Sequence, residues 1–216
     1  MINKPTGNQV HLFGYFRSSA SWRLRIALNL KNIEYNYTPI NLLENKQNSE
    51  EYKLLNPSGL VPTLYIDGNL FSESLSICEY LEETRPNNNL LPKDAAIKAK
   101  IRAFCEVINS GIQPLHNLRV LKKVESLNYD KLKWAKEMNI TGLNTIEQLL
   151  EKTKGKYCFG DTITLADVFL YPQAHSAFNR FKVDSNDYKN IREVFDNLST
   201  VKEFIDALPE NQIDYK

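Results

Sequence analysis

Residues 16–28, FRSSASWRLRIAL, place adjacent serines among three arginines at the point where a predicted helix begins. Serine is a common helix N-cap, so Ser18 and Ser19 could serve only to satisfy the first backbone N–H groups of that helix. The same position also suits an anion, because a hydroxyl donor and the positive end of the helix dipole meet there. The residues alone leave both interpretations open.

A thiolate is one anion that such a site could stabilise. A free thiol has a pKa of about 8.5, and lowering that pKa by about two units requires roughly 2.7 kcal/mol. A hydroxyl hydrogen bond to a charged sulfur contributes about 1.5–3 kcal/mol. A helix N-terminus adds about 0.3–1 kcal/mol. Together the two contributions are sufficient without a protein cysteine or a general base.

Two further segments could bind a peptide-like ligand. Pro62 forces Val61 into an extended conformation, so the N–H and C=O groups of Val61 can pair with an extended peptide as a strand would. Glu73 and Ser74 stand where another helix begins, and a helix N-terminus with a hydroxyl suits a carboxylate. Glu73 could bind an ammonium group. Val61-Pro62 could equally be an ordinary start of a strand.

The elements that must position these residues alternate along the first part of the chain. The pattern predicts strands at 10–16, 35–42, 63–66 and 70–72, and helices at 18–31, 49–56 and 72–84. Asp67-Gly68 between two apolar runs predicts a hairpin. The first strand–helix–strand unit should be parallel and right-handed. These elements make a small mixed sheet covered by helices.

The second part of the chain is predicted to be helical. PNNNLLPKD at 86–94 marks the boundary between two domains. Helices are expected at 95–124, 130–153, 165–178 and about 190–207. Pro114 should interrupt the first of these helices. Thr164 and Asp167 resemble a capping box that opens the third.

Composition excludes several classes of protein. The net charge is +1, so no field of one sign attracts nucleic acid. No apolar run approaches the ~20 residues of a membrane helix, and the N-terminal residues lack a signal core. Cys78, Cys105 and Cys158 are far apart and form no CxxC. We therefore expect buried thiols in a reducing, cytoplasmic compartment, with no metal site and no membrane partner.

Several motifs occur in register along nearly the whole chain. They are SSASWRLRIAL at 18–28, Asn56-Pro57, Val61-Pro62-Thr63-Leu64, Asp67-Gly68, Glu73-Ser74, GIQPLHNL at 111–118, YCFGDTITLADVFLYPQ at 157–173 and FKVD at 181–184. The pattern around Asn56–Ser74 is similar to that of most glutathione transferases. The stretches at 18–28, 111–118 and 181–184 resemble the zeta class in particular, the class that includes maleylacetoacetate isomerase.

The resemblance implies an α/β plus all-α fold, with a thioredoxin-like glutathione-binding domain at 1–86 and an α-helical domain at 93–216 that carries much of the substrate site. It also implies a homodimer with glutathione as the cofactor. The implied reaction is cis–trans isomerisation of maleylacetoacetate, a small dianion, to fumarylacetoacetate in tyrosine and phenylalanine catabolism. The expected mechanism is addition of the thiolate, rotation and elimination.

The resemblance also implies roles for individual residues. Ser18 activates the thiol with Ser19 as a helper, and Arg180 holds a substrate carboxylate. The residues implied to bind glutathione are Ser18, Ser19, Ala20, Ser21, Trp22, Arg23, Gln47, Val61, Pro62, Glu73, Ser74, Gln113, Asn117, Leu118 and Arg119. Those implied to bind the substrate are Arg17, Gln113 and Arg180. Zeta enzymes often have cysteine where this chain has Ala20, so we expect isomerisation not to need that thiol.

Two alternatives remain at this point. A maleylpyruvate isomerase, or a glutathione transferase that acts on α-haloacids, would share the site and differ only in substrate. A non-catalytic interaction module of the same fold is the second alternative. Such a module would have no need for Ser18, Val61-Pro62, Ser74 and Arg180 together.

Overall fold

The structure is a computed structural model that describes residues 5–7 and 9–215. The chain divides into two compact units, and the second of them runs from Asn89 to Val201. The first unit contains the residues up to Asn88 together with those from Lys202 onward. The sequence predicts that all of 93–216 is one helical domain, whereas the last part of that range groups with the first unit. Residues 1 and 216, the outer ends of the predicted domains, lie outside the described residues.

A four-stranded mixed sheet forms the centre of the first unit, as the sequence predicts. Its strands are β1 His11–Gly14, β2 Asn36–Pro39, β3 Thr63–Ile66 and β4 Asn69–Ser72. They lie in the order β2-β1-β3-β4. β1 and β2 are parallel, and β3 is antiparallel to both of its neighbours. The predicted parallel β-α-β unit and antiparallel hairpin are therefore confirmed.

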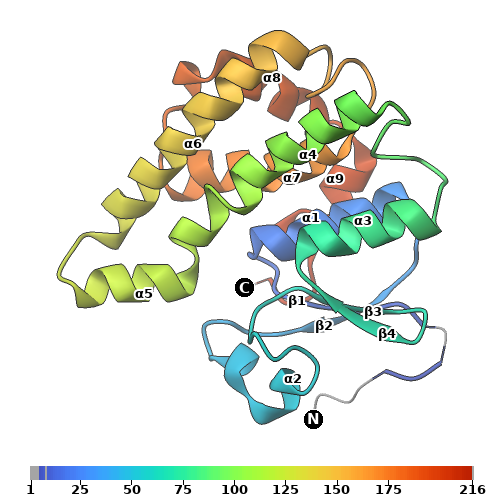
Figure 1. The fold of residues 1–216 in the computed structure, drawn as a ribbon. Helices are drawn as coiled ribbons and strands as arrows, with labels where there is room; N and C mark the ends of the chain where they lie inside the picture. Colours follow the sequence, from blue (N-terminus) through green and yellow to red (C-terminus); the bar gives the residue numbers. More distant parts are fainter. Residues whose placement is uncertain (1–4, 8, 216) are drawn as a thin grey trace. The chain divides into compact units, whose positions relative to one another are not determined.

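Helices cover both faces of this sheet (Figure 1). They are α1 Ser19–Leu30, α2 Glu50–Lys53 and α3 Ser74–Thr84, with a 3-10 turn, η1 Lys46–Asn48, before α2. α1 and α3 lie side by side on one face, and α2 lies on the other. Phe13 of β1 packs with Ile40, Tyr52 and Leu55 in a buried cluster, which joins α2 to the sheet.

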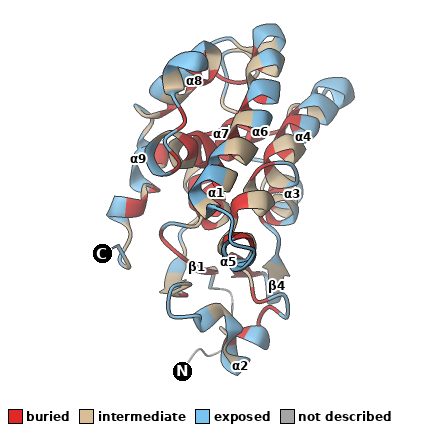
Figure 2. Ribbon diagram, turned by 90° about the vertical axis from the view of Figure 1, so that its left-hand side faces the viewer, coloured by how far each residue is buried: buried red, intermediate tan, exposed pale blue. Residues whose placement is uncertain are grey.

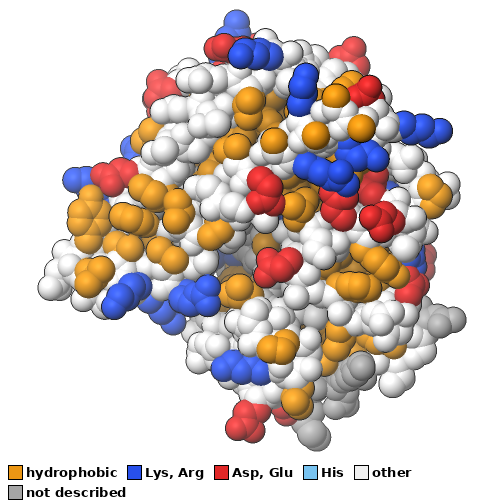
Figure 3. All heavy atoms as spheres, in the orientation of Figure 1, with side chains coloured by type: hydrophobic (Ala, Val, Ile, Leu, Met, Phe, Trp, Pro, Cys, Tyr) orange, Lys and Arg blue, Asp and Glu red, His pale blue; other side chains and the backbone are white. Residues whose placement is uncertain are grey.

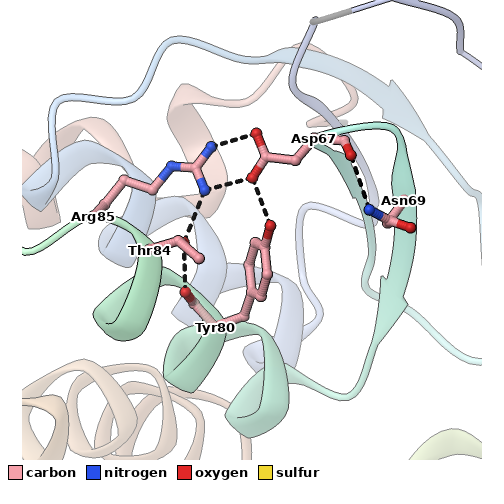
Figure 4. A network of polar contacts seen from close by, with 5 residues as sticks. All are labelled: Asp67, Asn69, Tyr80, Thr84 and Arg85. Carbon is pink, nitrogen blue, oxygen red and sulfur yellow. Dashed lines mark hydrogen bonds and ion pairs between the residues drawn. The ribbon is translucent and has the colours of Figure 1, made fainter.

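A polar network ties the β3–β4 turn to the end of α3 (Figure 4). The Asp67 carboxylate accepts hydrogen bonds from both terminal nitrogens of Arg85, at 2.5 and 2.6 Å, and from the Tyr80 hydroxyl at 2.6 Å. The Arg85 hydrogen bonds are the main reason why the pKa of Asp67 lies below its usual value. Asp67 and Gly68 both have positive φ, as the Asp-Gly hairpin signal predicts. The network holds the hairpin that leads into α3.

The second unit is built from helices. They are α4 Ala95–Asn109, α5 Leu118–Ser126, α6 Lys131–Thr153, α7 Leu165–His175 and α8 Lys189–Leu198, with short turns η2 Gln113–His116, η3 Ser176–Arg180 and η4 Ser185–Asp187. α7 packs against α4 and α8, and nearly every residue of α7 is buried (Figure 2). The helix predicted over 95–124 is interrupted as expected, because α4 ends at Asn109 and Pro114 lies at the start of the 3-10 turn η2.

The buried helix α7 begins as the sequence predicts. The Asp167 carboxylate accepts hydrogen bonds from the backbone N–H of Thr164 and from the backbone N–H of Cys158, each at 2.8 Å. The predicted helix at 165–178 differs at its other end, because the backbone widens into the π-helical turn η3 after His175. Such turns within helices occur frequently at functional sites.

The single helix predicted over about 190–207 is two helices in the structure. α8 ends at Leu198, and α9 Lys202–Asp206 follows after a turn, with a 3-10 turn, η5 Pro209–Asn211, beyond it. The Ser199 hydroxyl donates to the Phe195 carbonyl at 2.8 Å and helps to end α8.

The break after α8 lets the chain enter the first unit. There α9 packs along α1, and the Asn29 side-chain amide donates to the Glu203 carbonyl at 3.1 Å. Phe204 of α9 is fully buried. Across the described ranges, no helix combines the length and the apolar character that crossing a membrane requires.

Candidate active site

One end of the sheet gathers three segments that the sequence singles out. Phe13 near the end of β1 pairs with Thr63 at the start of β3, and Thr63 also pairs with Ser72 at the end of β4. The chain therefore leaves β1 toward α1, enters β3 and leaves β4 toward α3 at the same end of the sheet. Because β3 is antiparallel to both β1 and β4, the start of β3 lies beside the ends of these two strands. The starts of α1 and α3 therefore lie near the segment before β3.

Ser18 caps α1 while its proton remains available. Its Oγ accepts a hydrogen bond from the Ser21 N–H at 3.2 Å, and its own N–H donates to the Tyr15 carbonyl at 3.0 Å. A serine hydroxyl has two lone pairs and one proton, so the cap occupies a lone pair and not the proton. None of the described residues accepts that proton. Capping and donation to a bound anion are therefore compatible at this one side chain.

The first turn of α1 contributes further hydrogen-bond donors, and a buried serine of that turn fixes the loop before the helix. The backbone N–H groups of Ser19 and Ala20 have no carbonyl one turn earlier in the helix to bond. Ser21 is fully buried, and its Oγ accepts from the Tyr15 N–H at 3.3 Å. Trp22 is buried as well. Four of the predicted contact residues at this helix start are therefore buried in the unit, namely Ser19, Ser21, Trp22 and Arg23.

The start of α3 is joined to α1 by a buried contact. Ser74 is the first residue of α3 and is buried, and its Oγ accepts from a terminal nitrogen of Arg23 at 3.0 Å. Arg23 is fully buried, so this contact positions Ser74 and leaves its proton for another acceptor. Glu73 is exposed and has a φ of 67°, a region that residues other than glycine seldom adopt. Backbone strain of this kind is concentrated at functional sites.

The segment before β3 is held by two side chains. The Val61–Pro62 peptide bond is cis. The carbonyl of the preceding residue, Leu60, accepts hydrogen bonds from the Tyr52 hydroxyl at 2.7 Å and from the Asn56 side-chain amide at 2.9 Å. Burial raises the pKa of Tyr52 to about 12, so Tyr52 keeps its proton near neutral pH.

Tyr52 and Asn56 therefore fix the approach to Val61. The sequence does not single out Tyr52, and it marks Asn56 only as part of the Asn-Pro motif. Their spacing from Leu60 carries no periodic signal, because the contact depends on how the loop after α2 folds back.

Gln47 lies in η1, in the connection that follows β2. Its side-chain amide donates to the Asn45 side chain at 3.2 Å. Its Oε1 is buried and has no hydrogen-bond partner among the described residues. An unsatisfied buried acceptor costs about 1–3 kcal/mol, so a donor from a ligand would be favourable there.

In the second unit, three of the predicted contact residues lie on one short stretch. Gln113 is the first residue of η2, and Leu118 is the first residue of α5. Asn117 caps α5, because its Oδ1 accepts from the Val120 N–H at 2.9 Å. All three side chains are half-buried, so each retains surface for a ligand.

Positive charge is concentrated on α5. Arg119 is exposed, and Lys122 and Lys123 follow it on the same helix. Figure 3 shows blue side chains grouped over this helix, below a group of hydrophobic side chains. The protein as a whole has a net charge of only +1. The helix therefore supplies a local positive potential of the kind that a dianionic ligand needs.

Arg180 and Gln113 belong to segments that meet. Arg180 is exposed at the end of η3, and its guanidinium carbon lies 4.8 Å from the centre of the Phe181 ring. That ring lies 4.9 Å from the ring of His116, the last residue of η2. The Gln173 side-chain amide contacts His116 Nε2 at 3.2 Å. The sequence predicts a role for Arg180, whereas the buried link through His116 and Gln173 is a finding of the structure.

The cysteines do not supply a nucleophile. Cys78, Cys105 and Cys158 are all buried and take part in no disulfide within the described residues. Burial raises the pKa of Cys78 to about 12 and holds the pKa of Cys158 well above its usual value. Both groups are therefore thiols near neutral pH, and the thiolate is the reactive form. Arg17, which precedes Ser18 in the sequence, is exposed and adds positive charge to this loop. The site is suited to stabilising a thiolate that arrives with a ligand.

Comparison with known proteins gives matches over both units. The glutathione S-transferase N-terminal domain matches residues 17–84, and the C-terminal domain matches residues 140–200. Maleylacetoacetate isomerase of Dictyostelium discoideum is 47% identical over 97% of this chain and 97% of its own. The holo structure of a maleylpyruvate isomerase, a bacterial zeta-class glutathione S-transferase, has a TM-score of 0.92 at 36% identity and covers 95% of this chain and 100% of its own. Maleylacetoacetate isomerase of Anaeromyxobacter dehalogenans with bound glutathione has a TM-score of 0.88 at 35% identity, with 96% and 98% covered.

Proposed function

The chain belongs to the glutathione S-transferase family, in the zeta class with the maleylacetoacetate isomerases, and on this premise we propose that it isomerises maleylacetoacetate to fumarylacetoacetate with glutathione as cofactor. The observation that carries the proposal is Ser18, whose hydroxyl caps α1 and still has its proton to donate. We further propose that the reaction serves tyrosine and phenylalanine catabolism in the cytoplasm.

The residues at the sheet end fit glutathione. Ser18 is a donor for the sulfur, and the backbone of Val61, which the following proline restricts to extended conformations, can pair with the peptide part of the ligand. Ser74 at the start of α3 is a donor for the γ-glutamyl carboxylate, and Glu73 is an acceptor for its ammonium group. The unpartnered Oε1 of Gln47 offers a further acceptor. The donors and acceptors of this chain thus match the groups of the ligand.

When bound, glutathione supplies a thiolate that adds to the conjugated double bond, and the resulting single bond can rotate before elimination. Ser18 donates a hydrogen bond to the sulfur and so favours its charged form. The free N–H groups at the start of α1 act in the same direction through the helix dipole. Ser19 stands on this turn and supports the hydroxyl of Ser18.

We propose that substrate carboxylates bind to arginines. Arg180 suits this role because a planar guanidinium binds a carboxylate with two hydrogen bonds, and because the Phe181 ring supports one of its faces. Arg17 next to Ser18 and Arg119 on α5 add positive charge. Addition of the thiolate to the conjugated double bond moves negative charge onto the carbonyl oxygen of the substrate, which gives an enolate. Gln113 and Asn117 offer amide donors to that oxygen.

The experiment that tests the proposal compares substrates. Purified protein is assayed with maleylacetoacetate and with maleylpyruvate, each with and without glutathione. We expect turnover of maleylacetoacetate only when glutathione is present, at a higher kcat/KM than for maleylpyruvate. Activity without any thiol would contradict the cofactor assignment. A preference for maleylpyruvate would favour the alternative that the 0.92 TM-score to a maleylpyruvate isomerase supports.

We also propose that the protein is a homodimer, as the family resemblance implies. Light scattering coupled to size-exclusion chromatography measures this directly. The expected mass is twice the 24.9 kDa of one chain, and a mass of one chain would contradict the proposal.

A further inference from the structure

The C-terminal segment after α9 ends against the loop that carries Ser18. After η5 the chain reaches Asp214, whose Oδ2 accepts a hydrogen bond from the backbone N–H of Phe16 at 3.0 Å. Phe16 is two residues before Ser18 and lies 198 positions from Asp214 in the sequence. The next residue, Tyr215, packs its ring edge-on against the Phe16 ring with centres 5.6 Å apart.

The carbonyl of Phe16 accepts a hydrogen bond from a side chain that also contacts the C-terminal segment. Arg25 is fully buried in α1, and one of its terminal nitrogens donates to the Phe16 carbonyl at 3.0 Å. The Nε of Arg25 donates to the carbonyl of Ala207, just after α9, also at 3.0 Å. Arg25 thus connects the loop before α1 to the C-terminal segment. The N–H of Phe16 is thus bonded directly by this segment, and its carbonyl is bonded by Arg25, which also bonds the segment.

Within the loop itself, the Ser21 hydroxyl accepts a hydrogen bond from the Tyr15 N–H at 3.3 Å. The Ser18 N–H donates to the Tyr15 carbonyl, which closes a tight turn around Phe16 and Arg17. A turn of this size can tilt as a unit unless its peptide groups are held from outside. The carboxylate of Asp214 provides such a hold, because hydrogen bonds to charged acceptors are stronger than those between neutral groups.

We propose that the C-terminal segment is a positioning element for the thiol-activating serine, with Asp214 as the positioning residue. Asp214 holds the Phe16 peptide, and through the turn at Phe16 and Arg17 it sets where the Ser18 hydroxyl points. The inference rests on the proposed function for its effect on glutathione, whereas the hold on Phe16 stands independently. Asp214 does not touch the sulfur and therefore does not act as a catalytic residue.

The test uses the full chain with three substitutions. Asp214→Ala removes the acceptor, and Asp214→Asn keeps an oxygen that can accept from Phe16. Glu210→Ala is the matched control, because Glu210 is an exposed carboxylate of the same segment. Amide hydrogen exchange is followed at Phe16 and Ser18, and calorimetry gives the Kd for glutathione. The pH titration of thiolate absorbance gives the pKa of the bound thiol.

In Asp214→Ala we expect the Phe16 amide to exchange about tenfold or more faster, which is the size of effect that loss of a charge-assisted hydrogen bond gives. We also expect weaker glutathione binding and a higher bound-thiol pKa. Asp214→Asn should restore most of both properties, and Glu210→Ala should match the parent. Unchanged exchange at Phe16 in Asp214→Ala would overturn the inference. Faster exchange with unchanged glutathione affinity and thiol pKa would also overturn it.

These readouts separate two kinds of failure. If the parent protein does not bind glutathione at all, the proposed function fails, and exchange at Phe16 still tests the hold by Asp214. If Asp214→Ala does not fold, the neutral Asp214→Asn variant still tests the inference. Asp214→Asn should then keep the Phe16 amide protected from exchange. A chain lacking residues 213–216 serves as the comparison that loses the contact altogether. If Asp214→Asn loses as much protection and glutathione affinity as that chain, the role of the accepting oxygen is overturned.

Discussion

A methyl group added at Gly142 should destabilise the second unit. Gly142 is buried in the middle of α6. A Cβ placed there would lie 2.1 Å from Cγ1 and 2.3 Å from Cδ1 of Ile112, whereas carbon atoms in contact are usually about 3.5–4.0 Å apart. Ile112 is fully buried, so its side chain has little space into which it can move. The Ile112 side chain would have to move by about 1.5 Å to restore ordinary contact.

Two opposing contributions decide whether Gly142→Ala stabilises or destabilises the protein. Replacing glycine by alanine inside a helix is favourable by about 1 kcal/mol when nothing else changes. Overpacking a core costs about 1–3 kcal/mol. We therefore expect Gly142→Ala to lower the free energy of unfolding by up to about 2 kcal/mol, the part of the overpacking cost that helix propensity does not offset. Because Ile112 immediately precedes Gln113, we also expect a higher KM for the substrate.

Urea unfolding followed by circular dichroism measures the change. Thr141→Ala is the matched control, because Thr141 is the neighbouring residue of the same helix and is exposed. It should be as stable as the parent or slightly more stable. In the double variant Gly142→Ala with Ile112→Ala, the two losses should be less than additive, because the new methyl group occupies part of the space that Ile112 leaves. A Gly142→Ala variant more stable than the parent would refute this account of how α6 packs.

Three further changes test the supports of the candidate site. Asn56→Ala removes the amide donor to the Leu60 carbonyl, and steady-state kinetics should show a higher KM for glutathione with a smaller change in kcat. Tyr52 has its pKa raised to about 12 by burial, so folding favours its protonated form. The resulting stability is complete below about pH 10 and declines as the pH rises toward about 12. Denaturation of the parent and of Tyr52→Phe across this range should show a steeper decline in the parent. Ala20→Cys should make activity sensitive to peroxide while changing turnover little, since a cysteine at a helix N-terminus has a lowered pKa. A large gain in rate from Ala20→Cys would mean that the hydroxyl of Ser18 contributes less than we infer.

The local elements of the fold could be predicted from the sequence because each has a local cause. Alternating apolar residues and the Asp67-Gly68 pair predict the sheet and its hairpin, and Pro114 predicts the interruption after α4. The serines before α1 predict a cap, and Ser18 is the cap in the structure. Capping and anion binding do not exclude each other at Ser18, because the cap uses a lone pair and not the proton.

The remaining features depend on contacts between residues that are distant in the sequence. The C-terminal segment returns to the first unit through Arg25, Ala207 and Asp214, and no periodicity in residues 202–215 indicates this. The same holds for the contact between Phe181 and His116 in the second unit. The helix expected over about 190–207 is broken because its two halves pack in different units. A helical pattern of apolar residues does not reveal which unit each half packs against.

The central claim is that the Ser18 proton, and not merely the cap, stabilises the glutathione thiolate. Ser18→Asp tests it most directly, because aspartate caps a helix about as well as serine while its ionised carboxylate has no proton to donate. Ser18→Ala is the comparison that loses both functions. Urea unfolding should show Ser18→Asp close to the parent and Ser18→Ala less stable by about 1 kcal/mol.

The decisive measurement is the pH titration of glutathione bound to Ser18→Asp, followed by thiolate absorbance. We expect the thiol pKa in Ser18→Asp to return to about 8.5 or above, with isomerisation lost although the protein is as stable as the parent. A bound thiol whose pKa stays as low as in the parent, with turnover retained, would contradict it and leave Ser18 as a cap alone.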